Sequence, residues 1–300
     1  MQDIKAQIQA LKIQHKALIL AHNYQAVEIQ DIADYRGDSL QLAILSAQVN
    51  SPVIVFCGVR FMAETAAILN PASKVLLPVL DAGCPMADMI TAEQLIAFKA
   101  QYPGAVVVCY VNSTVEIKAL SDICCTSSNA VKVIQSIPQD KTILFVPDRN
   151  LGSWAGQQTG RHVITWDGYC PTHQWGFRAE DVHELRFRYP EHKLLVHPEC
   201  DGLIVQEADE VLSTGGMMKY VEQHDKVILA TETGMADYLS HLYPGKSIIP
   251  LSPKAVCKNM KKTTLEHVLA ALENQQHHIQ VEAGIAEQAK HAIDRMLALS

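Results

Sequence analysis

Three short apolar runs that each end in a cysteine decide the fold: VLLPVLDAGC at 75–84, RHVITWDGYC at 161–170 and SIIPLSPKAVC at 247–257. The cysteines themselves, Cys84, Cys170 and Cys257, lie 86 and 87 residues apart. Regular spacing over such long gaps predicts one folding unit used three times, with a thiol in the equivalent place of each copy.

Polar residues keep the same register as the cysteines. Each unit has a further apolar run that leads into a polar cluster, and equivalent positions in these clusters are 88 and 87 residues apart. The three sets are His22, Tyr110 and His197; Tyr24, Asn112 and Glu199; and the hydroxylic residues Ser39, Ser127 and Thr214. Unrelated Val and Ile runs, which any α/β protein contains, do not explain why polar positions stay in step.

The repeat predicts an α/β fold of three similar αβα units, with short parallel sheets arranged with pseudo-threefold symmetry around a central active site. Apolar runs without polar alternation suit parallel strands that are covered on both faces. We expect the units at 1–86, 87–173 and 174–262. Residues 263–300 break the repeat and predict a helical tail that packs back on the units, with Thr263 or Thr264 as a helix cap.

Composition narrows the class of protein. The chain has 300 residues, a net charge of −7 and 48% hydrophobic residues, which indicates an ordered globular protein. It lacks the basic face that duplex nucleic acid requires, and its apolar stretches are too short for a membrane span. The N-terminal residues do not form a signal peptide, so we expect a cytoplasmic protein whose eight cysteines are thiols or metal ligands.

The three cysteines in register predict a soft-metal site with one open position. Two kinds of site fit this pattern: zinc in a three-cysteine site, and a cuboidal 4Fe–4S cluster with one iron unligated by protein. The alternative is that these are small buried apolar residues. The remaining cysteines (Cys57, Cys109, Cys124, Cys125 and Cys200) fall outside the register and are interpreted mostly as buried thiols.

The other polar sets predict anion binding and proton transfer. Ser39, Ser127 and Thr214 fall where strands turn into helices, where hydroxyls and backbone N–H groups bind carboxylates or phosphate; the alternative is that they are plain helix caps. His197 and Glu199 are two residues apart and form a candidate acid–base pair. His173 follows Cys170 by three residues and is a predicted neighbour of the metal.

These motifs together resemble those of quinolinate synthase over nearly the whole chain. The segments that carry the resemblance are His22–Gln25, Gly37–Ser39, Tyr110–Ser113, Cys124–Ala130, Pro147–Gly152, His197–Cys200 and Ser213–Gly215, with Cys84, Cys170 and Cys257 and the Lys261–Thr263 segment.

The resemblance implies an enzyme that condenses iminoaspartate with dihydroxyacetone phosphate to quinolinate, with loss of phosphate and water, in NAD biosynthesis. It implies one 4Fe–4S cluster held by Cys84, Cys170 and Cys257, and iminoaspartate supplied by an L-aspartate oxidase or dehydrogenase. Tyr24, His197 and Glu199 become catalytic residues. The implied substrate contacts are His22, Ser39, Tyr110, Asn112, Ser127, His173 and Thr214.

Three other functions remain open at this point. A cluster-dependent hydro-lyase acting on a hydroxy acid would share the open iron and the anion pocket but would need no triose phosphate. A non-catalytic iron–sulfur sensor or scaffold would not need His197 and Glu199. A zinc protein would be colourless and free of iron.

Overall fold

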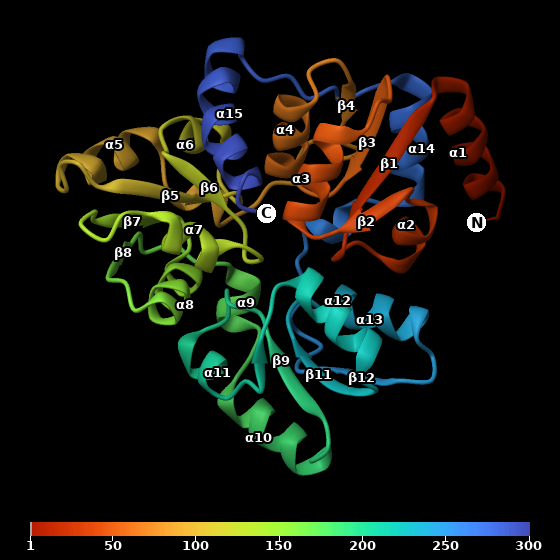
Figure 1. The fold of residues 1–300 in the computed structure, drawn as a ribbon. Coiled ribbons are helices and arrows are strands. Elements are labelled where there is room, and N and C mark those ends of the chain that lie inside the picture. Colours follow the sequence, from red (N-terminus) through yellow and green to blue (C-terminus); the bar gives the residue numbers. More distant parts are fainter. Residues whose placement is uncertain (1) are drawn as a thin grey trace.

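Three four-stranded parallel sheets form the framework of the computed structural model, which describes residues 2–300 (Figure 1). The first sheet belongs to α1 (Gln2–His15), β1 (Ala17–His22), α2 (Val27–Ile32), β2 (Tyr35–Gly37), α3 (Ser39–Gln48), β3 (Val53–Cys57), α4 (Arg60–Leu69) and β4 (Lys74–Leu76). A short 3-10 turn, η1 (Ala87–Met89), leads to the next unit.

The second and third units repeat this alternation. The second contains α5 (Ala92–Ala100), β5 (Val106–Tyr110), α6 (Val115–Ala119), β6 (Ile123–Cys125), α7 (Ala130–Ser136), β7 (Ile143–Val146), α8 (Arg149–Thr159) and β8 (Val163–Thr165). After α9 (Pro171–Trp175), the third contains α10 (Ala179–Arg188), β9 (Lys193–Val196), α11 (Gly202–Gln206), β10 (Glu210–Val211), α12 (Thr214–Gln223), β11 (Lys226–Ala230), α13 (Thr233–Leu242) and β12 (Ser247–Pro250).

The strand order is the same in all three sheets: β2-β1-β3-β4, β6-β5-β7-β8 and β10-β9-β11-β12, with every neighbouring pair parallel. The central strands are almost wholly buried, as the unbroken apolar runs predict. In Figure 1 the three units surround a common centre. The predicted fold class is therefore confirmed.

One aspartate per unit fixes the edge of each sheet in the same way. Asp34, Asp122 and Asp209 accept the backbone N–H of Ile19, Val107 and Leu194 at 2.8, 2.7 and 2.8 Å. Each aspartate in turn donates its own N–H to the carbonyl of the same residue. These aspartates are 88 and 87 positions apart, so the same hydrogen bonds recur in the three units at the spacing found in the sequence.

The C-terminal helices pack on two different units. Thr264 caps α14 (Leu265–Asn274), as predicted, and α14 packs against α1 and β3 of the first unit. The last helix, α15 (Ala283–Leu297), packs mainly on α6 and β6 of the second unit and also on α4, and lies between these two units in Figure 1. We propose unit boundaries at 86, 173 and 262, because each follows one of the three cysteines by a few residues.

No helix within residues 2–300 combines the length and the apolar character needed to span a bilayer.

Candidate active site and metal centre

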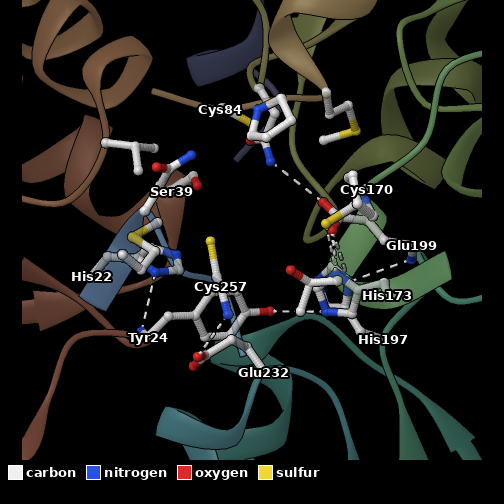
Figure 2. Close-up of a pocket in the computed structure, with 18 of the residues that line it drawn as sticks. His22, Tyr24, Ser39, Cys84, Cys170, His173, His197, Glu199, Glu232 and Cys257 are labelled. Carbon is white, nitrogen blue, oxygen red and sulfur yellow. Dashed lines mark hydrogen bonds and ion pairs between the residues drawn. The ribbon is translucent and has the colours of Figure 1, made fainter. Parts of the chain in front are cut away.

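A cavity of about 400 Å³ lies where the three units meet. Its walls include every residue that the sequence predicts as a site residue: His22, Tyr24, Ser39, Cys84, Tyr110, Asn112, Ser127, Cys170, His173, His197, Glu199, Thr214 and Cys257. Figure 2 draws 18 of the residues that line this cavity, and the ten labelled among them come from all three units. The residues that share the repeated spacing in the sequence therefore line one cavity.

The three cysteines in register differ from the other five. Cys84, Cys170 and Cys257 are free thiols, half-buried at the cavity wall, in the loops after β4, β8 and β12. Each loop continues into a short helical turn, formed by η1, by α9 and by η2 (Met260–Lys262). The remaining five, Cys57, Cys109, Cys124, Cys125 and Cys200, are free and fully buried, as expected for core thiols.

Burial and nearby backbone N–H groups act in opposite directions on the pKa of each of these three thiols. Burial raises the pKa of Cys84 to about 12, and the N–H groups of Met86 and Ala87 oppose that rise. Burial likewise raises the pKa of Cys170, opposed by the N–H of His173, and that of Cys257, opposed by N–H groups of its own loop. N–H groups directed at sulfur stabilise thiolates and tune iron–sulfur centres, so the donor set suits a cluster.

The distances between the three cysteine sulfurs distinguish a cluster site from a site for a single ion. Among residues 2–300, the one group of three Cys, His, Asp or Glu donors with all ligand atoms within 4.8 Å of one another is Cys170, His173 and Glu199. At least one pair among the sulfurs of Cys84, Cys170 and Cys257 is therefore farther apart than 4.8 Å. Two thiolates on one tetrahedral zinc lie only about 3.8 Å apart. The three cysteines thus fit a larger inorganic body better than one zinc ion.

The hydroxylic residues are not plain helix caps. The side chains of Asp38 and Ser213 cap α3 and α12, while Ser39 and Thr214 are the first residues inside these helices and line the cavity. Thr214 Oγ1 accepts a hydrogen bond from Asn23 Nδ2 at 3.2 Å. The hydroxyls of Ser39 and Thr214 are therefore directed by the helices without being the groups that cap them.

Asp38 joins the three units beside these hydroxyls. Its Oδ1 accepts the N–H of Gln41 at 2.9 Å, and its Oδ2 accepts the hydroxyl of Ser128 at 2.6 Å. Ser128 Oγ in turn lies 2.8 Å from Ser213 Oγ. A Cβ at Gly215 would lie 2.5 Å from Asp38 Oδ2, so this close approach requires glycine.

Two imidazoles occupy equivalent places and are neutral. His22 Nδ1 accepts the N–H of Tyr24 at 3.2 Å, and His197 Nδ1 accepts the N–H of Glu199 at 3.3 Å. Burial lowers the pKa of both histidines to about 3. Because Nδ1 accepts, the ring hydrogen is on Nε2, and His197 Nε2 donates it to Ser127 Oγ at 3.1 Å.

Glu199 is the charged centre of the cavity. Burial alone would raise its pKa, but His173, His197 and the hydroxyl of Tyr110 together lower the pKa to about 2. Its closest imidazole is His173, with Nδ1 at 2.7 Å from Oε2, whereas His197 Nδ1 is at 3.9 Å. The predicted His197–Glu199 pairing is therefore only the longer of two contacts, because α9 carries His173 in between.

Tyr24 connects to Glu199 through a residue that sequence reasoning missed. Tyr24 Oη lies 2.6 Å from Thr231 Oγ1, and Thr231 Oγ1 lies 3.0 Å from His173 Nε2. His173 Nδ1 then contacts Glu199. Burial and the charge of Glu199 raise the pKa of Tyr24 well above its usual value, so the phenol stays protonated. No signal in the sequence marks Thr231, which follows an ordinary buried strand.

A buried ion pair holds the loop of Cys257, and the sequence did not indicate it either. Glu232 has a fully buried side chain and accepts the N–H of Cys257 at 3.1 Å and that of Gly234 at 2.7 Å. Lys261 Nζ bonds Glu232 Oε2 at 3.1 Å and the carbonyl of Tyr24 at 2.6 Å. The same pair therefore positions a cysteine loop and the backbone of Tyr24.

The fold and the cavity define an α/β protein whose central site combines three thiols with acid–base and anion-binding groups. The chain belongs to the quinolinate synthase family, because the family model described as Quinolinate synthetase A protein matches residues 6–298. Proteins of this family are named as synthases, so the chain is an enzyme.

Relatives named quinolinate synthase are similar along their full length. The protein of Dehalococcoides mccartyi (strain CBDB1) is 53% identical over 296 residues, covering 98% of this chain and 97% of that protein. The protein of Methanoregula boonei is 50% identical, with 99% and 98% covered, and that of Geobacter metallireducens is 48% identical, with 99% and 97% covered. Among solved structures, the E-1-hydroxy-2-methyl-but-2-enyl-4-diphosphate reductase from Plasmodium falciparum has a TM-score of 0.34 at 10% identity. The match covers 91% of this chain and 94% of that one.

Proposed function

We propose that this enzyme condenses iminoaspartate with dihydroxyacetone phosphate to quinolinate, with loss of phosphate and water, as a carbon–carbon bond-forming transferase of NAD biosynthesis. The observation that carries the proposal is that three free thiols from three units border one cavity together with all the polar residues in register. Family membership supports the same reaction.

We assign Cys84, Cys170 and Cys257 to a 4Fe–4S cluster. With three protein ligands, one iron keeps an open position, and when bound the cluster supplies a Lewis acid for a hydroxyl, carbonyl or carboxylate of the substrate. The wider sulfur spacing supports this assignment over zinc.

The cavity offers neutral donors to anionic substrates. We assign the hydroxyls of Ser39, Ser127 and Thr214 to the carboxylates and phosphate, with the N-termini of α3 and α12 adding N–H groups and dipoles. Asn112 Oδ1 is buried and has no hydrogen-bond partner within residues 2–300, which suits a ligand N–H or O–H. His22, Tyr110 and His173 complete the proposed contacts.

Glu199, His197 and Tyr24 handle protons in this proposal. The low pKa of Glu199 keeps its carboxylate ionised as the proton acceptor, and neutral His197 donates from Nε2. Tyr24 keeps its phenolic proton until a neighbouring base accepts it. The contacts from Tyr24 through Thr231 and His173 to Glu199 form a continuous route for a proton between the two ends of the cavity.

A direct assay tests the reaction. Cluster-loaded protein is incubated without oxygen with oxaloacetate, ammonia and dihydroxyacetone phosphate, and quinolinate is measured by chromatography. We expect quinolinate from the native chain and from Glu210→Gln, an exposed carboxylate of the third unit, and a loss of at least about 100-fold in Glu199→Gln. No quinolinate from protein with a full iron and sulfide count would overturn the proposal.

The same protein preparations also test the three alternative functions. Turnover of a hydroxy acid without triose phosphate would favour a hydro-lyase, and a colourless iron-free protein after anaerobic purification would favour zinc. Normal rescue of an NAD auxotroph by Glu199→Gln would favour a sensor or scaffold. Supply of iminoaspartate by an L-aspartate oxidase or dehydrogenase and a cytoplasmic location stay predictions.

A further inference from the structure

A group of three potential metal ligands includes Cys170, one of the proposed cluster ligands. Cys170, His173 and Glu199 bring a thiol, an imidazole and a carboxylate together: His173 Nδ1 lies 2.7 Å from Glu199 Oε2 and 3.2 Å from Cys170 Sγ. The side chains of His173 and Glu199 are only 2% and 4% exposed. Figure 2 shows the three groups side by side at one wall of the cavity.

We propose that the cluster-free enzyme binds a single zinc-like divalent ion at Cys170 Sγ, His173 Nδ1 and Glu199 Oε2. Sulfur, imidazole nitrogen and carboxylate oxygen are the three donor types that zinc takes in proteins, at about 2.0–2.3 Å. Donors on one tetrahedral ion lie about 3.3–3.8 Å apart, so the observed distances need to open by less than about 1 Å.

The charges of this site balance. A divalent ion, one thiolate, one carboxylate and a neutral imidazole sum to zero, which suits a buried position. On binding, the thiol proton of Cys170 leaves to solvent. The ion takes Nδ1 of His173, and the ring hydrogen is then on Nε2, which contacts Thr231 Oγ1 at 3.0 Å.

The outer contacts that hold such ligands are already in place. The Nε2–Thr231 contact fixes the ring of His173, and Thr231 is fixed by Tyr24 at 2.6 Å. The second oxygen of Glu199 accepts the hydroxyl of Tyr110. Ligands oriented by such contacts typically bind a metal 10- to 100-fold more tightly than ligands without them. The cavity leaves room for water as a fourth ligand.

The single ion and the cluster exclude each other, because both take Cys170. This exclusion rests on the proposed cluster assignment, whereas the ion site itself does not. The ion needs neither Cys84 nor Cys257, and the cluster needs neither His173 nor Glu199. Zinc bound to newly made, cluster-free protein would therefore block loading of the cluster.

Cobalt(II) tests the site in the cluster-free full-length chain under reducing, oxygen-free conditions. We expect one cobalt per chain with the visible bands of tetrahedral coordination and a near-ultraviolet thiolate-to-cobalt band, both removed by one equivalent of zinc. Cys170→Ser should abolish the thiolate band, and Thr231→Val should weaken binding roughly 10- to 100-fold. Far-ultraviolet circular dichroism confirms that each variant is folded.

Cys84→Ser and Cys257→Ser are the matched controls. Both remove a proposed cluster ligand, yet both should keep the cobalt bands at native affinity. Loss of the bands in either control would place the ion among the three cysteines and overturn the proposal, as would native bands in Cys170→Ser or no bands in the native chain. Absence of quinolinate synthesis would overturn only the proposed function, so the two failures are distinguishable.

Discussion

Replacing Glu232 with glutamine removes the charge of the ion pair that holds the loop of Cys257. The carboxylate accepts three hydrogen bonds, from the N–H groups of Gly234 and Cys257 and from Lys261. An amide of the same shape keeps only one oxygen, so one of the three donors loses its acceptor and meets an NH₂ group instead. The substitution therefore changes electrostatics and hydrogen bonding without changing volume.

The loss in free energy of unfolding depends on how deeply Glu232 and Lys261 are each buried. Breaking a fully buried ion pair costs roughly 3–5 kcal/mol, and one unsatisfied buried donor costs roughly 1–3 kcal/mol. Here Glu232 is fully buried, but Lys261 is 25% exposed and keeps its bond to the carbonyl of Tyr24. We therefore expect a loss of about 2–3 kcal/mol, which lowers the Tm by roughly 3–5 °C for a chain of this size.

Two measurements check this expectation. Calorimetry of the cluster-free protein gives the change in Tm. Release of iron to a chelator from the loaded protein, without oxygen, reports on the loop of Cys257 and should be several-fold faster in Glu232→Gln.

Asp148→Asn is the matched control. Asp148 caps α8 in the second unit and is also fully buried, and its side chain accepts the N–H of Leu151 in its own helix, not an N–H of a cysteine loop. Burial raises the pKa of Asp148, which favours its neutral form, and asparagine caps a helix about as well as aspartate. We expect a loss below about 1 kcal/mol and native iron release. Equal iron release from both variants, or a native Tm in Glu232→Gln, would refute the reasoning.

Three further substitutions test other parts of the molecule. Cys84→Ser should abolish the brown chromophore and the iron and sulfide count, whereas Cys124→Ser, a change at a buried core thiol, should leave both intact. Tyr24→Phe should keep the iron but reduce turnover by at least about 100-fold, and full activity would show that its proposed role is wrong. Asp122→Ala removes the acceptor of the Val107 N–H and should cost about 1–3 kcal/mol in chemical denaturation, without loss of iron.

The period of the sequence predicted the fold because it records a repeated set of local contacts. Apolar runs mark the buried strands, and the cysteines mark the loops that follow the last strand of each sheet. The aspartates Asp34, Asp122 and Asp209 carry the same period and were readable from the sequence, although only the structure shows what they bond.

Residues whose side-chain partners are not repeated in the other units could not be found in this way. Thr231 and Glu232 act through partners 207 and 29 positions away, Tyr24 and Lys261, and such pairs appear only once the chain has folded. The role of His173 was only half predicted. Its proximity to Cys170 followed from the spacing of three, but its bond to Glu199 depends on how α9 docks beside the third unit.

The one-sulfur-per-unit arrangement ties maturation to completion of the chain. During synthesis on a ribosome, no nascent fragment that lacks Cys257 contains all three proposed cluster ligands. On the proposed assignment, the full set of ligands exists only once synthesis has passed Cys257, so the cluster can be completed only late in the making of the chain. A proteolytic cut that frees one unit would remove one proposed ligand, so retention of iron would report that all three units are still together.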